Sequence, residues 1–138
     1  VSLCLIAQVV GALAAARFGE HLPNRQTISV CALAGALLVA LFFVSRGNAT
    51  AILAVSIAFG FVWLFTLPFF AGWLIEIDPG RRAVLYLTAF QLGGAAVLPS
   101  IAGVAVGSFS VDAAMIFSGA IFLVLAAVPL LSKPAIRD

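Results

Sequence analysis

Uncharged, mostly apolar stretches alternate with short polar connections along the whole chain. Four of them, residues 26–45, 47–75, 83–111 and 113–132, are 20, 29, 29 and 20 residues long, and a fifth, residues 1–16, opens the chain. A helix needs roughly 20 mostly apolar residues to cross a bilayer core about 30 Å thick. The first stretch is slightly short of that length, and the other four reach or exceed it.

These stretches predict five membrane-spanning helices, because proline or glycine residues that end helices lie between them. The pattern therefore indicates an all-α, polytopic transmembrane helix bundle. The expected spans are 1–17, 27–45, 50–75, 83–106 and 111–131.

The basic residues fall almost entirely on one side of the expected spans. Arg46 is the single exception, in the second connection. Short loops rich in Lys and Arg remain in the cytoplasm. We therefore expect a multi-pass protein of the cytoplasmic (inner) membrane, with its first and third connections and its C-terminus in the cytoplasm. Six residues mark that side: Arg17, Arg25, Arg81, Arg82, Lys133 and Arg137.

Composition excludes several classes of protein. Hydrophobic residues make up 64% of the chain and charged residues 9%, whereas soluble domains carry roughly 25% charged residues. So few charges cannot cover a water-soluble globule. The net charge of +2, without a basic patch, also argues against nucleic acid as a partner. The expected surroundings are a lipid bilayer.

The chain offers little material for catalysis or for holding a metal ion. His21 is its only histidine, and Cys4 and Cys31 lie in expected spans without metal-binding spacing. Metalloenzymes bring several His or acidic ligands to one ion. We therefore expect no catalytic residue, no metal site and no cofactor.

Uncharged polar side chains within the spans are the remaining candidates for function. A primary amide exposed to lipid leaves its donors and acceptors unsatisfied. Gln8 and Gln91 should therefore either bridge helices or line a wetted cavity. Trp63, Thr66 and Phe70 share one helical face by their spacing. That face either lines a cavity for an apolar or aromatic compound or simply contacts lipid.

Prolines and small residues also recur within the spans. Pro68 and Pro99 interrupt the third and fourth spans, where each marks either a curved helix or a hinge beside a cavity. Gly103 and Gly107 form a GxxxG pair, a spacing that lets helix backbones approach closely. We expect this pair to support packing within the bundle.

One connection resembles a known family signature. Residues 16–25, ARFGEHLPNR, resemble the loop G-x-x-x-D-R-x-G-R-R of the major facilitator superfamily, with Glu20 at the acidic position and Arg25 at the last basic one. Residues 78–83, 91–94 and 98–99 also look like the tenth-to-eleventh helix region of its bacterial efflux members. The resemblance covers essentially the whole chain.

The resemblance implies that residues 1–138 are helices eight to twelve of a twelve-helix fold, in the C-terminal half of a transporter. The remaining N-terminal half of the same protein would then be a partner of these five helices. Consistent with this, the sequence opens inside an apolar run without Met, and we expect it to be a piece of a longer protein. The family implies a gating role for the loop residues Arg17, Glu20 and Arg25.

In this family helices eight, ten and eleven line the central cavity, and nine and twelve face lipid. The resemblance therefore favours four residues as substrate-binding candidates: Gln8, Trp63, Thr66 and Gln91. The expected function is secondary active transport of a small organic solute by alternating access, with proton-coupled efflux as one form. The alternative is a complete five-span membrane protein with a scaffolding or assembly role.

Overall fold

The computed structural model describes residues 2–78, 80–108 and 110–132, and within these ranges the regular structure is entirely helical. The expected hinge Pro99 belongs to a helix by its backbone, but its side chain is outside the described part, as are Lys133 and Arg137. The α-helices are α1 (Ser2–Phe18), α2 (Asn24–Val44), α3 (Ala49–Ile77), α4 (Arg82–Ser108) and α5 (Val111–Leu131), with a 3-10 turn over Gly19–His21.

The five expected spans are thus confirmed as helices, with every end within three residues of its expected position. The largest difference is at the start of α2, which begins at Asn24 instead of residue 27. Asn24 and Arg25 are polar, so the apolar pattern does not include them. They belong to the first helical turn because Pro23 precedes it with the fixed φ that suits a helix start.

Polar side chains cap the helices where the chain turns. The Asn48 side chain accepts a hydrogen bond from the N–H of Ala51 at 3.1 Å, and the Ser110 hydroxyl accepts one from Ala113 at 3.2 Å. Each bond satisfies a backbone donor that a helix start leaves without a partner. These caps fix the beginnings of α3 and α5.

Four helical segments among the described residues are long and apolar enough to cross a membrane. Many large apolar side chains also remain exposed on the outside of the bundle. Both properties are those of a multi-pass membrane protein. The four segments are Ser2–His21, Asn24–Val44, Ala49–Ile77 and Val111–Leu131.

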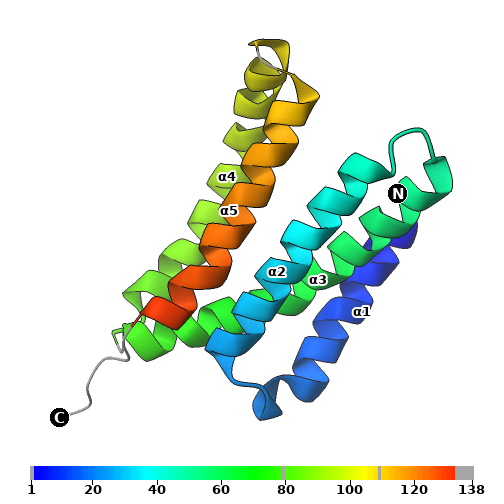
Figure 1. Cartoon of the computed structure of the whole chain (residues 1–138). Helices are drawn as coiled ribbons and strands as arrows, with labels where there is room; N and C mark the ends of the chain where they lie inside the picture. The colour runs from blue at the N-terminus through cyan, green and yellow to red at the C-terminus, as the bar shows by residue number, and fades with distance from the viewer. Residues whose placement is uncertain (1, 79, 109, 133–138) are drawn as a thin grey trace.

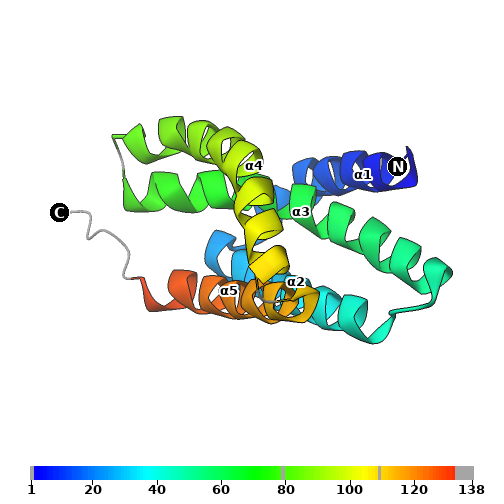
Figure 2. The same cartoon turned by 90° about the horizontal axis from the view of Figure 1, so that it is seen from above.

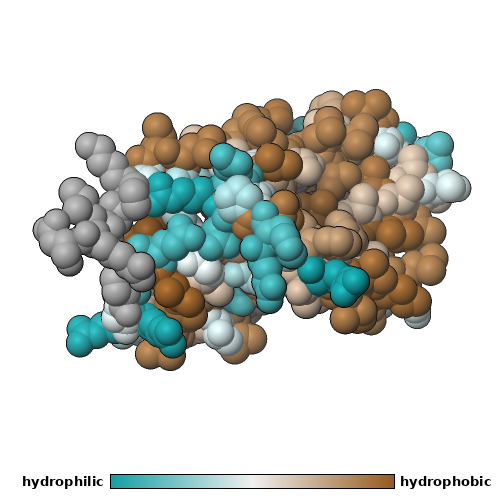
Figure 3. Space-filling model, turned by 90° about the horizontal axis from the view of Figure 1, so that it is seen from below, coloured by the Kyte–Doolittle hydropathy of each residue, from teal (hydrophilic) through white to brown (hydrophobic). Residues whose placement is uncertain are grey.

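The helices alternate in direction, so the connections lie at two ends of the bundle (Figure 1). The α1–α2 and α3–α4 connections lie at one end, which we call the basic end. The α2–α3 and α4–α5 connections lie at the other, which we call the Arg46 end. Seen from below in Figure 3, the basic end shows hydrophilic side chains with hydrophobic surface on either side of them. Arg17, Arg81 and Arg82 are exposed there.

Helix α1 packs against α3, and α2 packs against both α3 and α5. By contrast, α4 makes only sparse contacts with α3 and α5, and Figure 2 shows it crossing above the other helices. A small core at the basic end joins the first three helices. Its most buried side chains are Ala15, Ile28 and Phe69.

Glycines allow the closest helix contacts, but not the glycines that the sequence pattern favoured. A Cβ built at Gly11 of α1 would clash with the Phe61 carbonyl of α3, and one built at Gly35 of α2 would lie 2.7 Å from the Phe122 ring of α5. A Cβ built at Gly103 or Gly107 meets no described atom within 4 Å. The expectation that this GxxxG pair packs inside the bundle is wrong, because α4 is loosely attached.

Helix α3 passes through Pro68 without ending. Proline has no N–H, so the carbonyl of Leu64 lacks its usual helical partner, which weakens the helix locally. Figure 2 shows that the two halves of α3 run in different directions. A hinge function for Pro68 stays a prediction.

Candidate solute cavity

A cavity of about 220 Å³ lies among α2, α3, α4 and α5. Three of the four expected substrate-binding residues, Trp63, Thr66 and Gln91, line it together. Trp63 and Thr66 come from α3, and Gln91 comes from α4. The structure thus brings together residues 28 positions apart in sequence, although their part in binding stays a prediction.

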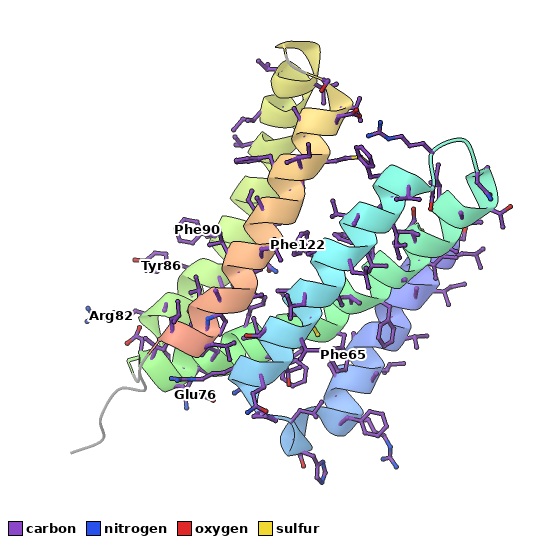
Figure 4. The ribbon with its side chains drawn as sticks, in the orientation of Figure 1. Phe65, Glu76, Arg82, Tyr86, Phe90 and Phe122 are labelled. Atoms are coloured by element: carbon purple, nitrogen blue, oxygen red, sulfur yellow. The ribbon has the colours of Figure 1, made fainter. Side chains whose placement is uncertain are left out.

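Aromatic rings form one wall of this cavity. The rings of Phe59 and Trp63 stack with centroids 6.4 Å apart, and Phe59 meets Phe122 edge-on at 5.9 Å. Figure 4 shows Phe122 pointing from α5 toward α2. It can lie there because Gly35 has no side chain to displace it. Such a wall suits the flat face of an aromatic compound.

Two polar side chains interrupt the apolar lining. The hydroxyl of Thr66 donates its hydrogen to the carbonyl of Val62 at 2.6 Å, and the side chain also forms a hydrogen bond with Cys31, which leaves one of the two acceptor sites on its oxygen for a ligand. Among the described residues, the Gln91 amide has no hydrogen-bond partner. It therefore offers a donor and an acceptor to a ligand. The described residues that line the cavity include no Asp, Glu, Lys, Arg or His.

Gln8 lies elsewhere. It belongs to α1 and extends over Gly60 of α3, where a built Cβ would lie 3.3 Å from its Cγ. This position is in the α1–α3 contact, outside the cavity lining. Of the two alternatives for a glutamine in a span, Gln8 is placed at a helix contact and Gln91 at a cavity.

The helices that line the cavity differ from those that the family resemblance implies. The second and fifth helices of the chain, expected to face lipid, contribute Cys31 and Phe122 among others, whereas α1 contributes none. The physical reason is that α2 packs directly against α5, which turns one face of each toward α3. The cavity is therefore inside this group of helices and not on the side of α1.

The expected gating residues are all at the basic end, where only Arg25 has an ion-pair partner. Its Nε lies 3.7 Å from Oε2 of Glu76 in α3, and its Nη1 donates a hydrogen bond to the Ser132 carbonyl at 2.7 Å. Asn24 also donates to Glu76, at 2.7 Å. Arg17 and Glu20 are exposed and form no ion pair with any described residue. Arg25 thus ties α2 to the ends of α3 and α5.

Comparisons of this chain with models of known families, with curated proteins and with solved structures found no match. The major facilitator resemblance therefore remains a prediction that rests on the residues quoted for it.

Sequence reasoning missed several residues of these sites. Glu76 directly follows a long uncharged stretch, so a search for acids at span ends would have found it. Phe59 and Phe122 gave no such signal, since the chain has 12 phenylalanines spread over the spans. Which of them meet depends on how α2, α3 and α5 pack.

Proposed function

We propose that this chain is part of a major-facilitator-type secondary transporter that moves a small, neutral, aromatic or largely apolar solute by alternating access. The observation that carries the proposal is the cavity that Trp63, Thr66 and Gln91 share. It combines an aromatic wall with two polar groups, which is the usual composition of a small-molecule site.

The chemistry of the lining supports a neutral solute. A charged solute in a site without a counter-ion would have to lose its hydration without compensation, which costs far more than the transfer of an apolar compound. One or two hydrogen bonds to Gln91 and Thr66 would orient the solute, and the rings of Phe59 and Trp63 would hold its flat face. In the proposed protein, a proton-coupling group would lie outside the described lining of this cavity.

The exposed apolar face of α4 is available for contact with further helices. Tyr86 and Phe90 are 62% and 77% exposed, and Figure 4 shows both pointing away from the other helices. In the proposed protein this face of α4 meets the other six-helix half. The basic end would face the cytoplasm of a cell with an inner membrane, and the contacts of Arg25 would hold that end closed.

Transport in membrane vesicles that contain the full-length protein tests this proposal. The probe is a neutral aromatic dye whose fluorescence reports its concentration in the vesicle. Gln91→Ala and Trp63→Ala should abolish energised transport while both proteins still insert into the membrane. Gln8→Ala is the matched control, since it removes an amide of the same kind from outside the cavity, and it should transport normally.

The outcomes of this experiment test the site assignment and the transport function separately. Equal transport by wild type, Gln91→Ala and Trp63→Ala would remove the site assignment. No energised transport of neutral aromatic compounds by the wild type would remove the function itself.

A further inference from the structure

A second groove, of about 310 Å³, runs between α2 and α5 toward the Arg46 end. Small residues hollow its floor: Ala36 and Ala40 from α2, and Gly119 from α5. Phe43 and Met115 line it nearer that end. No residue that lines this groove also lines the solute cavity. The groove is thus a separate site on the bundle.

An ion pair lies at the Arg46 end of this groove. Arg46, between α2 and α3, pairs with Asp112 in the first turn of α5. The guanidinium carbon of Arg46 is 4.2 Å from the centre of the Phe43 ring, and its Nη2 is 3.3 Å from the Met115 sulfur. Arg46 therefore touches two residues of the groove lining, which makes the apolar and charged parts continuous.

The position of this ion pair along the spans matches the level of lipid headgroups. Helices α2 and α5 are 21 residues long each, or about 31 Å at 1.5 Å per residue. This length equals a bilayer core of about 30 Å. Arg46 follows α2 by two positions, and Asp112 is the second residue of α5. Both charges therefore lie at the edge of the apolar zone.

The pair is still accessible to a ligand. The Arg46 and Asp112 side chains are 42% and 50% exposed. An exposed ion pair contributes only about 0–1 kcal/mol, so its members lose little by rearranging around a new partner. Arg46 has five N–H donors in a fork that fits a phosphate. Arg46 is positively charged and Asp112 is negatively charged, so the pair offers a positive and a negative site side by side.

We propose that this groove binds one phospholipid of the surrounding bilayer. The first part of an acyl chain lies along the floor, which extends about 12 Å from Ala36 to Val44. The lipid phosphate accepts hydrogen bonds from Arg46, and an ammonium group of the same headgroup binds Asp112. The lipid is therefore zwitterionic with a primary amine, as in phosphatidylethanolamine. An anionic headgroup without an amine would satisfy Arg46 and be repelled by Asp112.

Lipid retention by the full chain tests this proposal. The protein is extracted in mild detergent, mixed with phosphatidylethanolamine or phosphatidylglycerol, and examined by native mass spectrometry. We expect one phosphatidylethanolamine to bind, and about tenfold more weakly to Arg46→Ala, because a charge-assisted hydrogen bond to phosphate is lost. Arg17→Ala, which removes an exposed cation from the basic end, is the matched control and should bind as the wild type does.

Two further variants test the groove and the headgroup separately. Gly119→Leu should prevent binding by filling the floor. Its Cβ is tolerated, since the nearest atom is Cγ1 of Val39 at 3.9 Å. Asp112→Asn should abolish the preference for phosphatidylethanolamine over phosphatidylglycerol. No retained lipid, or retention that Arg46→Ala and Gly119→Leu leave unchanged, would overturn the site. Equal binding of both lipids by the wild type would overturn the headgroup assignment.

Discussion

Replacing Gly11 by alanine should separate α1 from α3. The built Cβ of Gly11 clashes with the Phe61 carbonyl and lies 3.2 Å from the backbone nitrogen of Phe65. These are helix backbone atoms, so no side chain can rotate away and the helices must move apart. Overpacking of this kind costs about 1–3 kcal/mol. Gly103→Ala is the matched control, since its built Cβ meets no described atom within 4 Å.

Both glycines lie inside helices, so the gain in helix propensity on changing glycine to alanine, about 1 kcal/mol, is common to the two variants. The difference between them therefore isolates the clash. The unfolding of both variants in mixed detergent micelles can be followed by circular dichroism. The free energy of unfolding of Gly11→Ala should be about 1–3 kcal/mol lower than that of Gly103→Ala. Equal stability of the two variants would refute the close contact of α1 with α3.

Three further predictions concern the cavity and the basic end. Thr66→Val should change the free energy of unfolding by less than about 1 kcal/mol, because the hydroxyl donates to Val62 of its own helix and its other partner, the Cys31 thiol, forms only weak hydrogen bonds. It should nevertheless weaken solute binding in a titration. Arg25→Lys should lower that free energy by about 1 kcal/mol, since a single ammonium cannot keep the bond to Ser132 and the ion pair together. Cys31 lines the cavity, so a bound solute should slow its modification by a small thiol reagent.

Each of these predictions has a result that contradicts it. Unchanged solute binding by Thr66→Val would remove its oxygen from the site. Wild-type stability of Arg25→Lys would mean that the contacts of Arg25 do not hold the basic end. For thiol modification, Cys4 is the internal control, because it lies outside the cavity lining. Equal protection of Cys4 and Cys31 would point to a general effect of the solute on the micelle.

The spans could be predicted from the sequence because their signal is local. Charges at positions such as Arg25, Arg46 and Asp112 divide the chain, and four of the five uncharged stretches have the length that a bilayer demands. The contacts between spans could not be predicted in the same way. Gly11 and Gly103 are both glycines in apolar stretches, yet only Gly11 meets another backbone.

The candidate site was predictable in part. Trp63 and Thr66 are three positions apart on one helix, so helical geometry alone puts them on the same face. Gln91 stood out because an amide is costly in lipid. That argument does not depend on the position of the amide, so it favoured Gln8 equally. Only the packing of α1 on α3 and of α4 beside α3 distinguishes the two glutamines.

Fluorescence of Trp63 gives the most direct test of the claim that the cavity binds a solute. The chain has two tryptophans, so Trp73→Phe leaves Trp63 as the only reporter. Titration with a neutral aromatic quencher should give saturable quenching at one site per chain. Gln91→Ala should weaken it about tenfold, the value of one hydrogen bond, and Gln8→Ala should not change it. Quenching that rises linearly, and equally in both variants, would contradict the account.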